Sequence, residues 1–293
     1  MLVNFNYLLK DAEKRNYGVG IIEAWDNYTI QAAVEAAVEE KSPAAVMAWQ
    51  YFIEKIGIET YANIALSYIK STDVPIALCL DECQDFGFII KCIKAGFSFV
   101  MHDGGAGEYG DSEKLDYNEN IKRTKEIVKI AHAVDVTVEA SLGEVPLAKE
   151  GKKNGMERGS YTDLDQASDF VKKTGIDILA PSIGNIHGLY KEKWPEPDWD
   201  LAKKLVEKTG VPCALHGSSG ASDEQLRKAI SVGFRKINIA TRYNEIYRKT
   251  LFEEISKCEG YACPFNSCVA AAEEFKKEAI RLMRKVYKSS GKC

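Results

Sequence analysis

The sequence contains no long uninterrupted apolar run, and no stretch approaches the roughly 18 apolar residues that a membrane-spanning helix needs. Positive charge is not in excess either, because the formal net charge is −4 at pH 7. This balance provides no strongly basic surface, so we expect neither nucleic acid nor a membrane as a partner. The first residues, Met1 to Asn6, show no basic segment followed by a long apolar one, and we expect a cytoplasmic protein.

Cysteine pairs of the CxxC type are also missing, although the chain contains eight cysteines. Most of them, such as Cys79 and Cys213, fall inside apolar segments that are expected to form strands or helices. We therefore expect reduced thiols rather than a disulfide framework. Cys258, Cys263 and Cys268 follow one another at intervals of five residues, which matches no known zinc-binding spacing, and we interpret this spacing as incidental.

Apolar, strand-like segments alternate with amphipathic, helix-like segments along the whole chain. Several strand-like segments are nearly continuous apolar runs, which are typical of parallel strands buried on both faces. The predicted strands are 18–24, 44–49, 76–80, 97–102, 136–140, 178–181, 211–215 and 236–239. Amphipathic helices are expected between them, among others at 28–40, 86–95, 120–132, 164–174 and 223–232.

A glycine repeatedly separates the end of a predicted helix from the next strand, where it is expected to form a left-handed helix cap. These glycines are Gly96, Gly175, Gly210 and Gly233. Eight βα units joined in this way predict the α/β class and a (β/α)8 TIM barrel, as one domain spanning residues 1–293. A doubly wound sheet is the alternative, but the GxGxxG fingerprint that often accompanies it is absent after the first strand. Two further helical stretches, 243–258 and 267–289, exceed a minimal barrel, and we expect part of them to form a subunit interface.

The chain has only four histidines, and two of them occur in matching settings. His187 and His216 each follow a short apolar run, and each is followed directly by a glycine. The carboxyl ends of the strands carry the functional residues of a TIM barrel, so both imidazoles are expected at that rim. Two imidazoles with a carboxylate form a common catalytic metal site for zinc, iron or manganese. His132 lies inside a predicted helix, and we interpret it as structural.

Polar residues end most of the other predicted strands and are expected to converge on the same rim. They are Glu23, Asp81, Glu82, His102, Asp103, Glu139, Asn238 and Thr241. The segment Gly217-Ser218-Ser219-Gly220 offers backbone N–H groups and hydroxyls directly before a predicted helix. Because the loops after strands seven and eight of such barrels commonly bind phosphate, this segment predicts a phosphate site.

In order and spacing, these motifs resemble the class II, metal-dependent fructose-bisphosphate and tagatose-bisphosphate aldolases. The resemblance is clearest in 183–191, 215–220 and 236–241, and it extends more loosely back to Leu80-Asp81. It implies reversible aldol cleavage of a phosphorylated ketose through an enediolate that a divalent metal stabilises. Zinc is the first expectation for this metal, with manganese, iron and cobalt as alternatives. The resemblance also suggests a homodimer or a homotetramer.

The resemblance assigns roles to individual positions. His187 and His216 correspond to metal ligands, and Asp81 corresponds to the residue that exchanges a proton with the aldehyde oxygen. The positions implied for binding the substrate and its phosphate are Gly188, Lys191, Gly217, Ser218, Ser219, Asn238 and Thr241. No lysine ends a predicted strand, which disfavours a Schiff-base route.

Some positions depart from the family pattern. The family usually has a second histidine where this chain has Glu82, so we expect Glu82 to complete the metal site, with His102 as the alternative ligand. The segment 144–159 replaces a glycine-rich, acidic loop of the family, and Glu150 or Glu157 is a candidate for the proton transfer of that loop.

Strand 1 of the family commonly carries an asparagine near the position of Glu23. Together with the changes at strands three and four, this difference predicts a substrate other than the standard fructose bisphosphate. Two alternative functions remain open. One is a non-catalytic sugar-phosphate-binding relative with a regulatory or assembly role, and the other is a different metal lyase or epimerase on the same fold.

Overall fold

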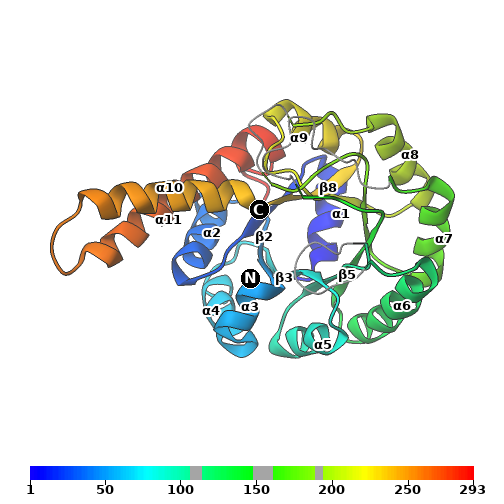
Figure 1. The fold of residues 1–293 in the computed structure, drawn as a ribbon, viewed down its shortest axis with the longest axis horizontal. Helices are drawn as coiled ribbons and strands as arrows, with labels where there is room; N and C mark the ends of the chain where they lie inside the picture. The colour runs from blue at the N-terminus through cyan, green and yellow to red at the C-terminus, as the bar shows by residue number, and fades with distance from the viewer. Residues whose placement is uncertain (106–113, 148–160, 189–193) are drawn as a thin grey trace.

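The computed structural model describes residues 1–105, 114–147, 161–188 and 194–293. Its strands are β1 (Val19–Glu23), β2 (Ala44–Trp49), β3 (Ile76–Cys83), β4 (Phe99–His102), β5 (Thr137–Leu142), β6 (Ile178–Pro181), β7 (Cys213–Leu215) and β8 (Phe234–Ile239). Each strand pairs with the next, and β8 pairs in parallel with β1, which closes the barrel (Figure 1). The structure therefore confirms the TIM barrel and excludes the doubly wound sheet.

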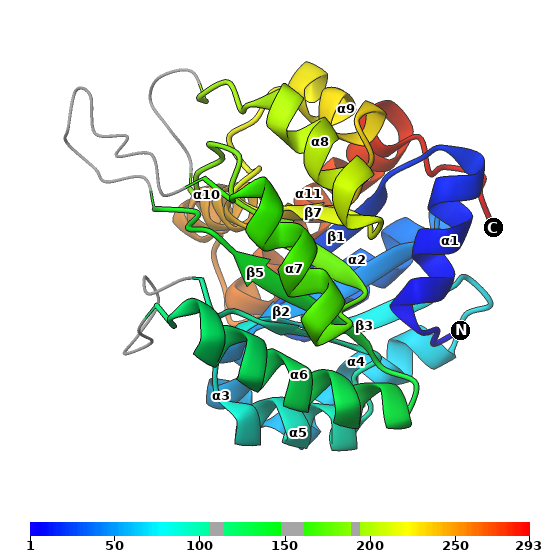
Figure 2. The same cartoon turned by 90° about the vertical axis from the view of Figure 1, so that its right-hand side faces the viewer.

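Helices surround this barrel, as Figure 2 shows from the side. They are α1 (Phe5–Arg15), α2 (Asn27–Glu39), α3 (Gln50–Ile56), α4 (Ile58–Lys70), α5 (Phe86–Ala95), α6 (Tyr117–Ala133), α7 (Leu164–Thr174), α8 (Trp199–Thr209), α9 (Asp223–Ser231), α10 (Thr241–Lys257), α11 (Cys263–Leu282) and a final π-helical turn (Met283–Tyr287). The predicted helices 86–95 and 164–174 agree at both ends. None of the described helices has the length and hydropathy that a membrane span needs.

Strand alternation divides the core into two layers. One set of strand side chains, including Ile21, Met47 and Phe99, fills the interior of the barrel together with Phe5 and Leu8 from α1. The opposite set packs against the outer helices in a larger cluster. The ring of Phe5 lies 5.1 Å from that of Phe99, measured between centroids. Helix α1 thus covers the amino-terminal end of the barrel, and the functional residues gather at the carboxyl ends of the strands.

The predicted glycine caps are confirmed at three of the four positions. Gly96, Gly175 and Gly210 are the left-handed C-caps of α5, α7 and α8. At the fourth position the C-cap is Val232, one residue earlier, and Gly233 follows it with φ of +109°.

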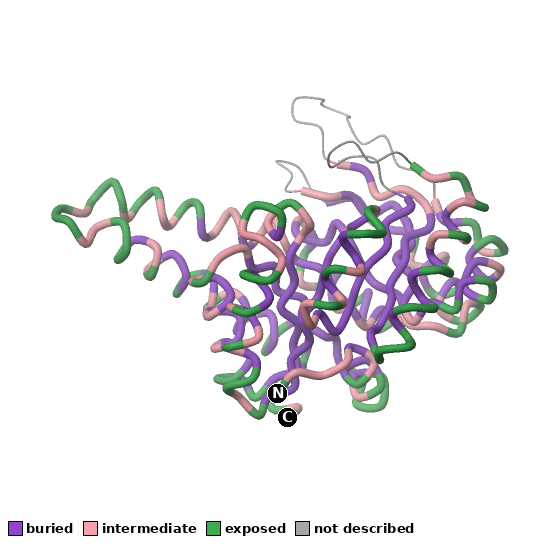
Figure 3. Tube along the Cα trace, turned by 90° about the horizontal axis from the view of Figure 1, so that it is seen from below, coloured by how far each residue is buried: buried purple, intermediate pink, exposed green. Residues whose placement is uncertain are grey.

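Helices α10 and α11 leave the barrel side by side and form a helical arm, residues 241–282 (Figures 1 and 3). The side chains of Phe252, Tyr261 and Phe265 are exposed on this arm. A disulfide joins Cys258 to Cys263. The expectation of reduced thiols is wrong for this pair, because the turn between α10 and α11 brings together two cysteines that the sequence shows only as neighbours in a series.

Candidate active site

Glu82 reaches the mouth of the barrel because β3 is irregular near its end. Ala77 and Cys79 point into the barrel, so simple alternation would turn Asp81 inward and Glu82 outward. The pairing of β3 with β4 shifts its register after Leu80, and Glu82 has a φ of +39°, which is rare for residues other than glycine. This β-bulge places two consecutive carboxyl groups at the mouth.

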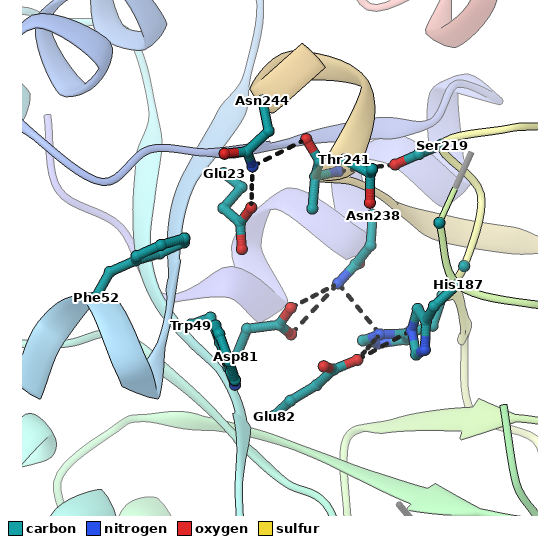
Figure 4. A pocket seen from close by; sticks show the side chains of 14 residues that line it. Glu23, Trp49, Phe52, Asp81, Glu82, His187, Ser219, Asn238, Thr241 and Asn244 are labelled. Carbon is teal, nitrogen blue, oxygen red and sulfur yellow. Dashed lines mark hydrogen bonds and ion pairs between the residues drawn. The ribbon is translucent and has the colours of Figure 1, made fainter. Parts of the chain in front are cut away.

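Glu82, His187 and His216 form a donor group whose ligand atoms all lie within 4.8 Å of one another. The Glu82 Oε1 atom lies 3.1 Å from His187 Nε2 and 3.1 Å from His216 Nδ1. Figure 4 shows Glu82 and His187 pointing toward each other. Two imidazoles and one carboxylate are the donor types of catalytic zinc, iron and manganese sites.

The electrostatics of the donor group suit a cation. Burial raises the pKa of Glu82, but the neighbouring His187 and His216 outweigh it and hold this pKa far below its ordinary value. Burial lowers the pKa of His216, but hydrogen bonds to Glu139 and Glu82 raise it to about 10. The carboxylates therefore favour positive charge at this point, and a divalent cation satisfies the same preference.

His216 is oriented by a buried carboxylate on β5. The Nε2 atom of His216 lies 2.6 Å from Glu139 Oε1, and Glu139 Oε2 lies 3.1 Å from Lys236 Nζ on β8. The side chains of Glu139 and Lys236 are completely buried. Because Nε2 of His216 is committed to Glu139, Nδ1 is the atom that faces Glu82 and can bind a metal.

The two loops that carry the histidines pack tightly against each other. Asn185, two residues before His187, donates its side-chain N–H to the backbone carbonyl of His216 at 3.0 Å. Gly217 has a φ of +62°, and a Cβ atom there would lie 2.5 Å from the backbone of Ile186. The glycine after His216 is therefore required by this close approach.

Asp81 lies beside the donor group and is held by Asn238. The Asn238 Nδ2 atom lies 3.3 Å from Asp81 Oδ1, and Lys236 donates to Asn238 Oδ1 at 2.7 Å. Lys236 thereby turns the amide nitrogen of Asn238 toward Asp81. Burial, opposed by the charge of Lys236, raises the pKa of Asp81 to about 6. A carboxyl group with such a pKa can both accept and return a proton near neutral pH.

Most of the predicted substrate-binding positions meet in one cavity of about 260 Å³ at the mouth. Those lining it are Gly188, Gly217, Ser219, Asn238 and Thr241. Ser218 has a structural role instead, since its buried hydroxyl donates to the Asn238 carbonyl at 2.5 Å. Lys191, Glu150 and Glu157 lie outside the described residues.

The N-terminus of α10 faces this cavity. From the sequence, the phosphate site was instead expected at the N-terminus of the helix after Gly220. That helix, α9, is capped by Ser222, and its first turn carries the acidic residues Asp223 and Glu224. Helix α10 begins at Thr241 and has no cap from any side chain of the described residues. The first N–H groups of α10 and the helix dipole favour an anion there.

His102 is not part of the donor group. The preceding residue, Met101, points into the barrel, and His102 therefore points outward, where its Nδ1 lies 2.8 Å from Thr124 Oγ1 on α6. Burial, assisted by the charge of Arg123, lowers the pKa of His102 to about 4. His102 is therefore a structural histidine, and the prediction of His102 as the alternative metal ligand is wrong. His132 is also structural, as predicted, with its Nε2 atom 2.8 Å from Asp177 Oδ2.

One wall of the cavity went unrecognised in the sequence. Trp49 at the end of β2, Phe52 on α3 and Asn244 on α10 line it (Figure 4). Asn244 donates to Glu23 Oε2 at 3.1 Å. Burial and the charges of Asp81 and Glu82 raise the pKa of Glu23 to about 8. The signal for Trp49 is the alternation along β2, in which Ala45 and Met47 also point inward.

Comparison with known proteins agrees with this site. The family model described as fructose-bisphosphate aldolase class-II matches residues 3–292. The chain belongs to this family. The sulfofructosephosphate aldolase of Alkalicoccus urumqiensis is 33% identical over 234 residues, which cover 80% of this chain and 78% of that protein. The 6-phospho-5-dehydro-2-deoxy-D-gluconate aldolase of Halalkalibacterium halodurans is 36% identical over 244 residues, 82% of this chain and 80% of that protein.

The crystal structure of the YdjI aldolase from Escherichia coli K12 superimposes with a TM-score of 0.84 at 28% sequence identity. The match covers 100% of this chain and 99% of that one. Family and fold thus support a class II aldolase, and two of these relatives are named for different phosphorylated substrates.

Proposed function

We propose that this protein is a metal-dependent aldolase that reversibly cleaves a phosphorylated ketose other than the standard fructose bisphosphate. The observation that carries the proposal is the convergence of Glu82, His187 and His216 on one point beside Asp81, at a cavity with a helix terminus that no described side chain caps. The two carboxyl groups stand side by side only because of the β-bulge in β3. A glutamate with a positive φ costs free energy, so the bulge does not stabilise the barrel. We therefore attribute the bulge to the chemistry at the mouth.

The three donor side chains would hold the metal, and zinc remains our first choice. A divalent cation at this point supplies Lewis-acid stabilisation of the negative charge that develops when the C–C bond breaks. His216 is kept in the binding orientation by Glu139, and Glu139 is balanced by Lys236.

Asp81 moves the proton. In the cleavage direction, its carboxylate takes the proton from the hydroxyl on the carbon that becomes the aldehyde. The C–C bond then breaks, and its electron pair stays with the ketose-phosphate half. In the synthetic direction Asp81 returns the proton to the aldehyde oxygen. The Asn238 amide holds Asp81 in place, and Ser219 and Thr241 lie where the phosphate of the ketose half meets the N-terminus of α10.

The donor group favours the enzyme over the two alternatives. A non-catalytic binder has no need for the Glu139–His216 contact, which orients a ligand nitrogen. A different lyase or an epimerase would share the donor group, so only product identity separates it from an aldolase.

The test is the release of dihydroxyacetone phosphate from a panel of ketose phosphates by metal-loaded protein. The Asp81→Asn variant keeps the hydrogen-bonding shape of this side chain but has no titratable oxygen. We expect it to lose C–C cleavage and to retain the same metal content, measured by elemental analysis. Cleavage at the wild-type rate by this variant, or no cleavage of any compound by the metal-loaded protein, would contradict the proposal.

We also propose that the helical arm forms the subunit interface of a homodimer or a homotetramer. Phe252, Tyr261 and Phe265 are large apolar side chains exposed on the arm, and such exposure is typical of an interface. Light scattering of a Phe252→Ser, Phe265→Ser variant is expected to give a smaller assembly than the wild-type protein.

A further inference from the structure

The cavity has two chemically different ends. Ser219 and Thr241 lie at one end, near the N-terminus of α10. Trp49 and Phe52 lie on the other side of Asp81 (Figure 4). A ketose phosphate that places its phosphate at the first end and its reacting carbons beside Asp81 must extend its remaining carbons toward the second end. These carbons are the ones that leave as the aldehyde.

At this second end the carboxyl group of Glu23 lies next to the Phe52 ring (Figure 4), and none of the described residues there is basic. Glu23 is only 5% exposed and lies on the cavity wall. None of the residues that line the cavity in the described part of the chain is a lysine or an arginine. An anionic group on the aldehyde would therefore enter this end next to Glu23, without a cationic partner among the described residues. The carboxyl oxygens of Glu23 can instead exchange hydrogen bonds with hydroxyl groups.

Aromatic rings make the second end rigid. Trp49 and Phe52 pack edge to face with their centroids 5.9 Å apart, and Trp25 packs on the same Phe52 ring at 6.1 Å. Such rings offer flat apolar faces that suit the C–H faces of a short carbon chain. Asn244 fixes the Glu23 carboxyl by a hydrogen bond of 3.1 Å, so its position is set before a ligand arrives.

We propose that Glu23 determines specificity by selecting an uncharged, hydroxylated aldehyde and excluding aldehydes that carry a phosphate. The substrate would accordingly be a ketose with a single phosphate, on the half that does not become the aldehyde. This inference rests on the proposed aldolase function, and it adds the chemical class of the second product.

The experiment measures condensation of dihydroxyacetone phosphate with two aldehydes that share a carbon skeleton, glyceraldehyde and glyceraldehyde 3-phosphate. At pH 9, where Glu23 with its pKa of about 8 is ionised, we expect the wild-type kcat/KM to favour glyceraldehyde by about 100-fold, because unpaired like charges in a partly buried site are strongly unfavourable. The Glu23→Lys variant introduces a cation at the same place and is expected to narrow this ratio at least about tenfold. The metal content should stay unchanged.

Two further variants keep the result interpretable. Glu23→Gln retains an acceptor for the Asn244 amide, so we expect it to fold even if Glu23→Lys does not. It should also narrow the ratio of the kcat/KM values for glyceraldehyde and glyceraldehyde 3-phosphate. Glu54 on α3 is exposed, and Glu54→Lys makes the same charge change outside the cavity, where solvent screens it. This control should leave the ratio at its wild-type value.

The outcomes separate the two proposals. Equal kcat/KM values for both aldehydes in the wild-type protein, or an unchanged ratio in both Glu23 variants, would overturn the inference and leave the aldolase function standing. If the metal-loaded protein condenses neither aldehyde but cleaves a ketose phosphate of the panel, the inference is overturned and the aldolase function stands. If it cleaves no compound of the panel either, both proposals fail.

Discussion

The mouth of the barrel and the flank covered by α6 each hold two of the four histidines, in contrasting environments. At the mouth, the ring centroids of His187 and His216 lie 6.2 Å apart, and both rings contact Glu82. On the flank, His102 contacts a threonine hydroxyl, and His132 contacts an aspartate. Convergence on a shared carboxylate, rather than burial or the residue type alone, thus distinguishes a candidate metal site from structural histidines.

The largest difference is expected between two single variants, one that removes a histidine from the mouth and one that removes a histidine from the flank. His216→Ala should lose its bound metal, and its kcat/KM should fall by more than about 100-fold, because a ligand and its Lewis-acid function are lost together. His132→Ala makes the same change on the flank and should keep both metal and activity. Elemental analysis and steady-state kinetics check this pair. Equal losses in the two variants would refute the distinction between the regions.

A smaller effect is expected from the carboxylate behind His216. Glu139→Gln removes the charge that orients the ring, and the metal affinity should fall by about 10- to 100-fold. The variant also leaves Lys236 buried without its ion-pair partner, so the free energy of unfolding should decrease by about 3 kcal/mol.

A double variant separates these two consequences. Adding Lys236→Met to Glu139→Gln removes the unpaired charge and should restore much of the stability, while the metal affinity stays low. Competition with a chelator and denaturant unfolding measure the two quantities. Recovery of metal affinity together with stability would show that Glu139 acts only by holding the fold.

The smallest effect on activity is expected at His102, where the change should appear only in stability. The pKa of this histidine is lowered from 6.5 to about 4 in the folded protein, so the unfolded chain binds the proton first as the pH falls. The stability of the folded protein should therefore be complete above pH 6.5 and decline as the pH falls toward 4, by up to about 3 kcal/mol from this group.

His102→Gln cannot titrate but can still donate to Thr124. Between pH 6.5 and 4 its unfolding free energy should decline less than that of the wild-type protein, and its kcat at neutral pH should not change. The unfolding free energy is measured with denaturant at each pH. If it declines equally in the variant and the wild-type protein, or if the variant loses its metal, His102 has a different role.

The barrel itself could be predicted because its signals are local. Apolar runs such as 44–49 and 178–181 match β2 and β6 at both ends, and the glycine caps mark where helices stop. Helix α1 was not predicted, because it precedes the first βα unit and the repeat of such units does not require it. A helical segment was expected after β2, but no bounds were predicted for the two helices, α3 and α4, that form it. The pairing of Cys258 with Cys263 likewise depends on the turn of the helical arm.

The prediction that Glu82 joins His187 and His216 came from the resemblance to the aldolase family and does not follow from strand alternation. Consecutive residues of a regular strand point to opposite faces, which correctly separates Met101 from His102 but would also separate Asp81 from Glu82. The β-bulge is what brings these two carboxyl groups into one site, and the local sequence contains no signal that predicts it. The contact of Lys236 with Glu139 joins strands that are distant along the chain, so it too required the structure.

Anomalous diffraction from crystals grown with excess zinc or manganese tests the central claim most directly. We expect one strong peak at the mouth, bound by Glu82 Oε1, His187 Nε2 and His216 Nδ1, with Glu139 still in contact with His216 Nε2. A peak elsewhere in the protein, or two imidazoles at the mouth that hold no ion between them, would contradict it.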